Sequence, residues 1–131
     1  MESFEKTILE IGCSKGDLAD TYSKKAEKYI GIDISDEAIK YAEQQNFKKC
    51  IFIASDAHQL PLENCSVDLV VVNSLLHHLD LKTSFKEINR VLTKDGKFIF
   101  REPLGTNPIF NLYRYFTPKA RTPDEKPFDF L

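Results

Sequence analysis

The stretch TILEIGCSKGD, residues 7–17, decides the fold class. It begins with a short apolar run of the length of a buried strand, and Gly12 ends that run. Gly12 and Gly16 lie four residues apart, so the backbone between them can turn tightly and approach a ligand without an intervening Cβ. A pair of glycines at this spacing is common, so its meaning depends on the rest of the chain.

Four further apolar runs, rich in Ile, Val and Phe, come after the first one. With it, they predict five strands, at residues 7–11, 29–33, 50–54, 67–72 and 97–100. Runs that are nearly continuously apolar are typical of strands buried on both faces, as in a parallel sheet covered by helices.

Helical patterns separate most of these runs. We expect helices at residues 17–28, 36–45 and 81–92, a stop and turn at Lys94-Asp95-Gly96, and either a loop or a short helix at 58–66. Ser35 is suited to cap the second helix, and Asp36 and Glu37 suit its positive end. Strands that alternate with helices predict an α/β fold with an open parallel sheet and right-handed crossovers.

Composition and length limit the function classes. A chain of 131 residues is one domain, and a net charge of -2 gives no long-range attraction to nucleic acid. No apolar run is long enough to cross a membrane, and residues 1–6 lack the pattern of a secretory signal, so we expect none. The three widely spaced cysteines predict free thiols in a reducing cytoplasm, and the histidines do not form a metal-binding pattern. We therefore expect a cytoplasmic protein without a bound metal.

Polar or small residues follow the predicted strands where each strand ends. Gly12 follows the first, Asp33 ends the second, Asp56 follows the third and Asn73 follows the fourth. In open α/β sheets ligands bind outside the carboxyl ends of the strands, and a carboxylate there can accept bonds from both hydroxyls of a ribose. The order and spacing of these residues predict a site for a ligand with a ribose and a base.

These motifs resemble those of the class I S-adenosylmethionine-dependent methyltransferases over about residues 6–103. Residues 8–16, ILEIGCSKG, resemble motif I of that family, and residues 31–35, GIDIS, resemble its second-strand motif. Residues 55–57, SDA, followed by LPL and SVD, and the ExxRVL run from Glu87 complete the pattern. The similarity is greatest to enzymes of the ubiquinone-biosynthesis type. It implies a Rossmann-like, doubly wound sheet of about five mostly parallel strands in the order 3-2-1-4-5, with helices on both faces.

The resemblance implies that S-adenosylmethionine is the cofactor, with S-adenosylhomocysteine as the product. Gly12, Cys13, Ser14 and Gly16 would form the loop around its methionine and ribose. Glu10 would orient that loop or meet the methionine ammonium through water. Ser14 departs from the family pattern, which has glycine there, and a positive φ at a serine costs on the order of 1 kcal/mol.

The remaining cofactor contacts implied by the resemblance come from the later strand ends. Asp33 would hold the ribose diol, with Ile34 packed on the adenine. Asp56 would accept from the exocyclic amine of the adenine, while the Ala57 backbone N–H would donate to the ring. Asn73 would line the floor beside the methionine.

The expected reaction is in-line methyl transfer to a small-molecule acceptor, in which the protein aligns the reactants and excludes water. A base is needed only for an acceptor that must lose a proton, and His78, ahead of His77, is the candidate. Packing or capping roles are the alternatives for both histidines. Glu102 would touch the acceptor or form a salt bridge.

Two other functions are weighed against this one. A non-catalytic S-adenosylmethionine-binding module, or a truncated remnant without an acceptor site, is the main alternative. A nicotinamide-dependent dehydrogenase is disfavoured because residues 12–16 do not supply the G-x-G-x-x-G spacing.

The region after residue 102 differs in character from the preceding α/β domain of residues 1–102. Five of the six prolines lie in it, and regular strands are improbable with that spacing. We expect residues 103–131 to form a Pro- and aromatic-rich tail of the same domain, which covers the sheet or forms an active-site lid or a surface for a partner. A homodimer through the edge of the fifth strand or through this tail is also expected.

Overall fold

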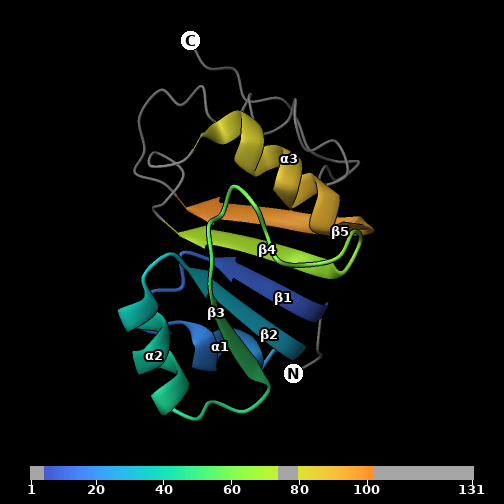
Figure 1. Ribbon diagram of the computed structural model, residues 1–131. Helices are drawn as coiled ribbons and strands as arrows, with labels where there is room; N and C mark the ends of the chain where they lie inside the picture. Colours follow the sequence, from blue (N-terminus) through green and yellow to red (C-terminus); the bar gives the residue numbers. More distant parts are fainter. Residues whose placement is uncertain (1–4, 74–79, 102–131) are drawn as a thin grey trace.

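A five-stranded sheet forms the centre of the molecule (Figure 1). The computed structural model describes residues 5–73 and 80–101. The strands are β1 (Glu5–Ile11), β2 (Ala26–Asp33), β3 (Cys50–Ala54), β4 (Val67–Asn73) and β5 (Leu92–Arg101). The helices are α1 (Ala19–Ser23), α2 (Asp36–Gln44) and α3 (Leu81–Val91).

All four strand pairings are parallel, and the strand order is β3-β2-β1-β4-β5. This confirms the expected Rossmann-like order. Ile11 at the end of β1 pairs with both Ile32 and Val72, and Asp33 pairs with Ala54. The strands therefore end together, and we call the edge at which they end the carboxyl edge of the sheet.

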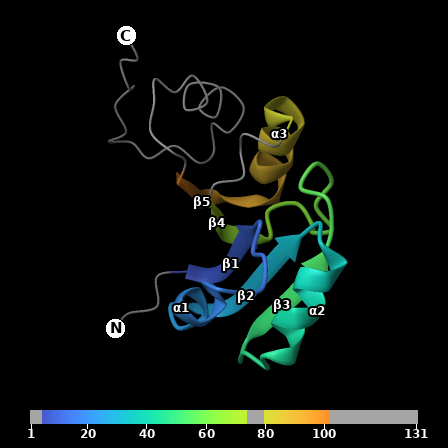
Figure 2. The ribbon, with the colours of Figure 1, turned by 90° about the vertical axis from the view of Figure 1, so that its left-hand side faces the viewer.

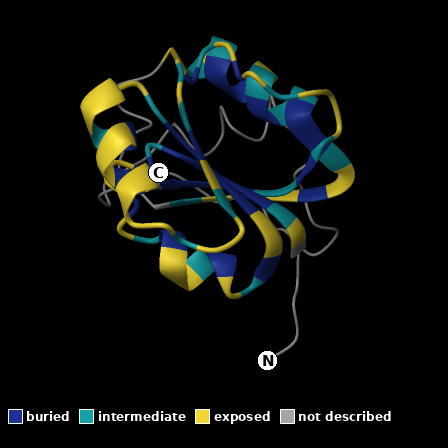
Figure 3. Ribbon diagram, turned by 60° about the horizontal axis from the view of Figure 1, so that its bottom comes forward, coloured by how far each residue is buried: buried dark blue, intermediate teal, exposed yellow. Residues whose placement is uncertain are grey.

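Side chains alternate between the two faces of the sheet, as the period of two in a strand requires. Ile8 and Tyr29 pack in a core with residues of α1 and α2, whereas Leu9 and Ile30 pack in a second core with Phe85 of α3. Helices therefore cover both faces, as expected, and α1 and α3 lie on opposite sides of the strands in Figure 2. The buried residues follow the strands and the inner sides of the helices (Figure 3).

The first helix is shorter than the sequence pattern predicts. The pattern indicates a helix over residues 17–28, but α1 covers only Ala19–Ser23. Ala26 instead pairs with Glu5 in the β1–β2 ladder and is buried, and Lys28 pairs with Thr7. Pairing with β1 therefore places these residues in a strand, although their spacing is also compatible with a helix.

The predicted stop and turn at residues 94–96 is wrong in its boundary. α3 ends at Val91, and Leu92 already has extended backbone angles. The register jumps from Val67 opposite Leu92 to Leu69 opposite Lys97, so the turn-forming residues produce an irregularity within β5. Residues 58–66, for which the sequence predicts either a loop or a short helix, form a loop.

The cap of α2 agrees with the prediction. Ser35 has extended angles, and its Oγ accepts a 3.2 Å hydrogen bond from the Ala38 amide. Asp36 and Glu37 occupy the first turn. Because the cap follows Asp33 by two residues, it sets how the chain leaves the carboxyl edge.

Several expectations fall on residues outside the described ranges. They concern Glu102, the tail at 103–131, and His77 and His78 in the segment 74–79. Within the described ranges, no helix is long and apolar enough to cross a membrane.

Candidate functional site: the carboxyl edge of the sheet

The loop after β1 turns back against the end of β2. The amides of Gly12 and Cys13 both donate to the carbonyl oxygen of Ile32, at 2.8 and 3.0 Å. Gly12, Ser14 and Gly16 have φ values of 80°, 51° and 85°. Glycine adopts such angles freely, but a serine in the left-handed region is strained. The structure thus settles the sign of φ at Ser14, which the sequence did not determine.

Asp33 joins two segments at the centre of the carboxyl edge. Its Oδ2 accepts a 2.8 Å bond from the Ser14 amide, and its Oδ1 accepts a 2.9 Å bond from the Ser35 amide. The carboxylate is thereby locked between the glycine loop and the start of α2. Each carboxylate oxygen has a second lone pair, so both can also accept a hydroxyl proton. This arrangement fits a vicinal diol such as that of a ribose.

An apolar surface lies next to that carboxylate. Ile34 is 77% exposed, the most exposed of the large hydrophobic residues described at the surface. Gly16 in the loop after β1 is buried, and a Cβ there would come within 3.3 Å of Phe52 in the core, so the position has little room for a side chain. Because Ile34 directly follows Asp33 and is exposed, an apolar base next to a diol, as in adenosine, fits these two residues.

Glu10 lies beneath the loop and is nearly fully buried. Tyr29 donates its hydroxyl proton to Glu10 Oε1 at 2.5 Å, and burial together with the neighbouring Glu10 charge raises the pKa of Tyr29. The tyrosine therefore stays a donor over the physiological range. This bond fixes one oxygen of Glu10 from the side of the core.

The Cys13 side chain also points into the core. It is 3% exposed, and burial, followed by the charges of Glu10 and Asp33, raises its pKa to about 12. The thiol therefore stays neutral and packs as an apolar group. A contribution of Cys13 to ligand binding would come from its backbone.

Asp56 follows β3 on the same edge. The Ser55 amide donates to the Asp33 carbonyl oxygen at 2.9 Å, so the end of β3 is tied to the end of β2. The Asp56 side chain is 55% exposed, whereas Ala57 is buried in the core beneath it. The carboxyl edge thus presents a second exposed carboxylate at the end of β3, next to the end of β2.

His58 makes a contact that the sequence did not reveal. Its Nδ1 lies 2.6 Å from Asp56 Oδ1, and its backbone N–H donates to the same oxygen at 2.8 Å. The Asp80 amide at the start of α3 donates to His58 Nε2 at 2.9 Å. The only hint in the sequence is a histidine two residues after the aspartate.

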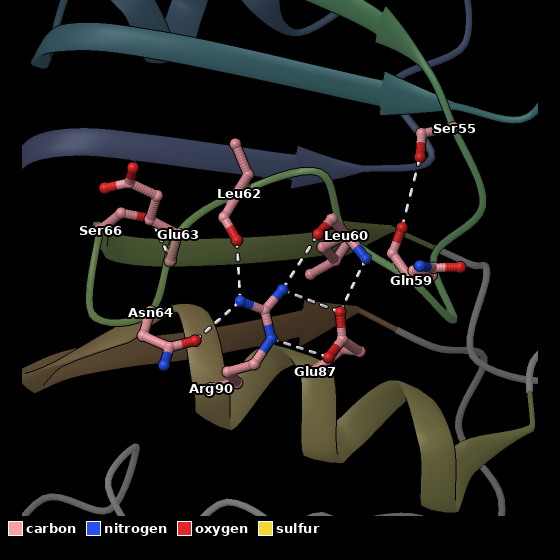
Figure 4. A network of polar contacts seen from close by, with 9 residues as sticks. All are labelled: Ser55, Gln59, Leu60, Leu62, Glu63, Asn64, Ser66, Glu87 and Arg90. Atoms are coloured by element: carbon pink, nitrogen blue, oxygen red, sulfur yellow. Dashed lines mark hydrogen bonds and ion pairs between the residues drawn. The ribbon is translucent and has the colours of Figure 1, made fainter.

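Arg90 and Glu87 of α3 hold the rest of that loop (Figure 4). The Arg90 guanidinium donates to the carbonyl oxygens of Leu62 and Leu60 at 2.8 and 3.0 Å, and to Asn64 Oδ1 at 2.9 Å. Glu87 accepts from Arg90 Nε at 2.8 Å and from the Leu60 amide at 2.7 Å. The i,i+3 spacing predicts the ion pair, but it does not predict the loop partners.

Most of the expected site residues are therefore brought together. Those that share the carboxyl edge or the loop beside it are Glu10, Gly12, Cys13, Ser14, Gly16, Asp33, Ile34, Asp56 and Ala57. Asn73 ends β4 at this edge, and His78 lies outside the described residues. Within the described ranges no group of three or more metal-ligating side chains occurs.

Comparison with known proteins agrees with this geometry. A family model described as "Methyltransferase domain" matches residues 9–100, which is most of the chain. The chain belongs to this methyltransferase family. Family and fold imply S-adenosylmethionine as the cofactor, and the Asp33 carboxylate with the exposed Ile34 next to it fits the adenosine part of that molecule.

Two curated relatives show the extent of the similarity. The methyltransferase domain is 33% identical over 123 residues to the demethylmenaquinone methyltransferase of Chlamydia pneumoniae, covering 83% of this chain and 54% of that protein. It is 29% identical over 117 residues to the ubiquinone biosynthesis O-methyltransferase of Nitrosomonas europaea, covering 83% and 48%. The chain thus spans about half the length of these relatives.

A solved structure is similar as well. The crystal structure of the YcgJ protein from Bacillus subtilis superposes with a TM-score of 0.70 at 27% identity, covering 76% of this chain and 44% of that one. The methyltransferase domain is therefore similar to this structure in both sequence and fold.

Proposed function

We propose that the chain binds S-adenosylmethionine along the carboxyl edge of the sheet and transfers its methyl group to a small-molecule acceptor. The observation that carries the proposal is Asp33, whose two oxygens are oriented by the amides of Ser14 and Ser35. A carboxylate held in this way is preorganised for a diol, because little of its side-chain freedom remains to be lost on binding.

The proposed cofactor contacts follow the strand ends. They are Glu10 and the backbone of Gly12, Cys13, Ser14 and Gly16 for the methionine and loop side, Asp33 and Ile34 for the ribose and adenine, Asp56 and Ala57 for the adenine edge, and Asn73 for the floor. When bound, the cofactor supplies a methyl group already activated by its positive sulfur. The protein then has to align the acceptor in line with that group and to exclude water.

The acceptor is proposed to be a small molecule. Two relatives carry names of small-molecule methyltransferases, and the net charge of -2 does not favour nucleic acid. His78 is proposed as the base for an acceptor that must lose a proton. The free thiols of the three cysteines suit a reducing cytoplasm, which is the proposed location.

A homodimer is proposed through the outer strand of the sheet. Within the described residues β5 pairs only with β4, and Ile99 on it is 54% exposed. Residues 1–102 are proposed as the cofactor domain, with 103–131 as its tail. A second copy or the tail would cover this edge.

The experiment is a methyl-transfer assay on the full chain with methyl-labelled S-adenosylmethionine and a panel of small phenols, amines, thiols and carboxylates. Labelled product together with S-adenosylhomocysteine is the expected result. Binding of the cofactor without transfer to any acceptor would favour the alternative of a non-catalytic binding module. A chain that binds neither S-adenosylmethionine nor S-adenosylhomocysteine would contradict both the enzyme and the binding module.

A further inference from the structure

His58 links the second carboxylate of the site to the start of α3. One nitrogen of its ring, Nδ1, lies 2.6 Å from Asp56 Oδ1, and the other, Nε2, lies 2.9 Å from the backbone nitrogen of Asp80. Asp80 is the N-cap of α3 and is 22 residues further along the chain. The ring therefore connects the loop after β3 to the N-terminus of α3.

The partners determine where the ring proton lies. A backbone N–H can only donate, so Nε2 must accept from Asp80 with its lone pair. Nδ1 then carries the proton and donates it to the Asp56 carboxylate. Neutral His58 with its proton on Nδ1 is the form that satisfies both contacts.

Both hydrogen bonds from His58 to Asp56 fall on the same oxygen. The His58 ring and the His58 backbone N–H converge on Oδ1, and these bonds hold the pKa of Asp56 below its usual value. Among the described contacts Oδ2 is thus left for a ligand. The carboxylate is turned in one direction although its side chain is 55% exposed.

We infer that His58 is a positioning residue of the cofactor site, and that its protonation weakens cofactor binding. The inference rests on the proposed function, because it assigns Asp56 Oδ2 to the exocyclic amine of the adenine. His58 holds Asp56 in the accepting orientation and ties it to the backbone of Asp80, the residue at the N-cap position of α3.

Protonation acts on both ends of this link. A second proton on Nε2 removes the acceptor for the Asp80 amide, so a donor then faces a donor. At Nδ1, the positive charge of the imidazolium partly neutralises the Asp56 carboxylate, which makes Asp56 a weaker hydrogen-bond acceptor for a ligand. The charged groups that face the ring are the carboxylates of Asp56 and Asp80, and the latter also accepts from Thr83 Oγ1 at 2.6 Å.

Two substitutions separate the two bonds. In His58→Asn, the side-chain amide nitrogen takes the place of Nδ1, so the donor to Asp56 is kept and the acceptor for Asp80 is lost. In His58→Gln, the amide oxygen takes the place of Nε2, so the acceptor is kept and the donor is lost. Neither side chain titrates, so both remove the proposed pH dependence.

The test is calorimetric titration of the full chain with S-adenosylhomocysteine from about pH 8 to about pH 5, the range over which histidine changes its charge. Thermal unfolding at each pH shows that each protein is folded. His77 and His78 are present in all three proteins and add the same slope to each. The readout is therefore the difference in slope between the wild type and the variants.

We expect the wild-type affinity to fall by about 3- to 10-fold on acidification, the value of one ordinary hydrogen bond. Both variants have a flatter profile, and at about pH 8 His58→Asn binds more tightly than His58→Gln. Wild-type binding with the same slope as the variants overturns the role of His58 and leaves the proposed function in place. A wild type that binds no S-adenosylhomocysteine at any pH overturns both.

Discussion

The carboxylate of Asp33 accepts a 2.8 Å hydrogen bond from the backbone amide of Ser14, which lies 19 residues earlier in the chain. This bond joins the loop after β1 to the end of β2. It makes the position of Asp33, the proposed ribose-binding carboxylate, depend on the conformation of the glycine loop. Changes in that loop should therefore alter both stability and cofactor affinity.

Ser14→Gly should stabilise the protein. Ser14 has a φ of 51°, which costs a serine on the order of 1 kcal/mol, while the amide that Asp33 accepts from is kept. We expect the free energy of unfolding to rise by about 0.5–1 kcal/mol in urea denaturation. Glu63→Gly, at an exposed loop residue without a positive φ, is the control and should lower stability. Equal effects of the two substitutions would show that Ser14 is not strained.

Gly31→Ala should destabilise the sheet next to the loop. A Cβ at Gly31 would lie 2.9 Å from both Cys13 Sγ and Phe52 Cδ1, closer than these atoms can pack. Overpacking of this kind costs about 1–3 kcal/mol, measured as a shift of the denaturation midpoint. Cys13→Ala removes the Sγ contact but keeps Cys13 Cβ, which would lie 3.0 Å away, so the double variant should recover part of the loss. Strict additivity of the two substitutions would contradict this packing account.

Glu87→Gln should weaken the hold of α3 on the loop after β3. The hydrogen bond from Arg90 holds the pKa of Glu87 below its usual 4.5, and the bond from the Leu60 amide acts in the same direction. Partial burial opposes both but is outweighed. A carboxyl whose folded pKa is depressed stabilises the protein above its unfolded pKa, and this contribution is lost as the pH falls through the folded value. The variant should therefore be less stable at neutral pH by about 1–3 kcal/mol, and the difference should shrink below about pH 4.5.

Unfolding curves at several pH values check this prediction. Glu27→Gln removes an exposed carboxylate of β2 and is the matched control. A difference between wild type and Glu87→Gln that is the same at neutral and acid pH would contradict the ion-pair explanation.

Much of this site was predictable because each signal was local. Gly12 and Asp33 are the residues at which apolar runs end, and Ser35 is a standard cap before a helical run. In a parallel sheet, residues at strand ends meet on one edge, so their order along the chain was sufficient to group them.

The remaining features depend on partners far away in the chain. The helical spacing of Ala26 is compatible with a helix, and only its pairing with β1 takes it into a strand. Arg90 bonds Leu62 and Leu60, 28 and 30 residues earlier, and His58 bonds Asp80, 22 residues later. No period along the sequence encodes such contacts. The sign of φ at Ser14 likewise depends on the closure of the loop onto Ile32, which a sequence pattern does not contain.

The most direct test of the cofactor site is calorimetric titration of S-adenosylhomocysteine into the wild type, Asp33→Asn and Asp95→Asn. The last of these makes the same change of charge at an exposed residue in the irregular part of β5. In Asp33→Asn one of the two backbone amides loses its acceptor and the diol loses the charged group, so we predict an affinity about 10- to 100-fold weaker. We predict that Asp95→Asn binds as the wild type does. Equal affinities for Asp33→Asn and the wild type, with both proteins folded, would contradict the assignment of this edge as the S-adenosylmethionine site.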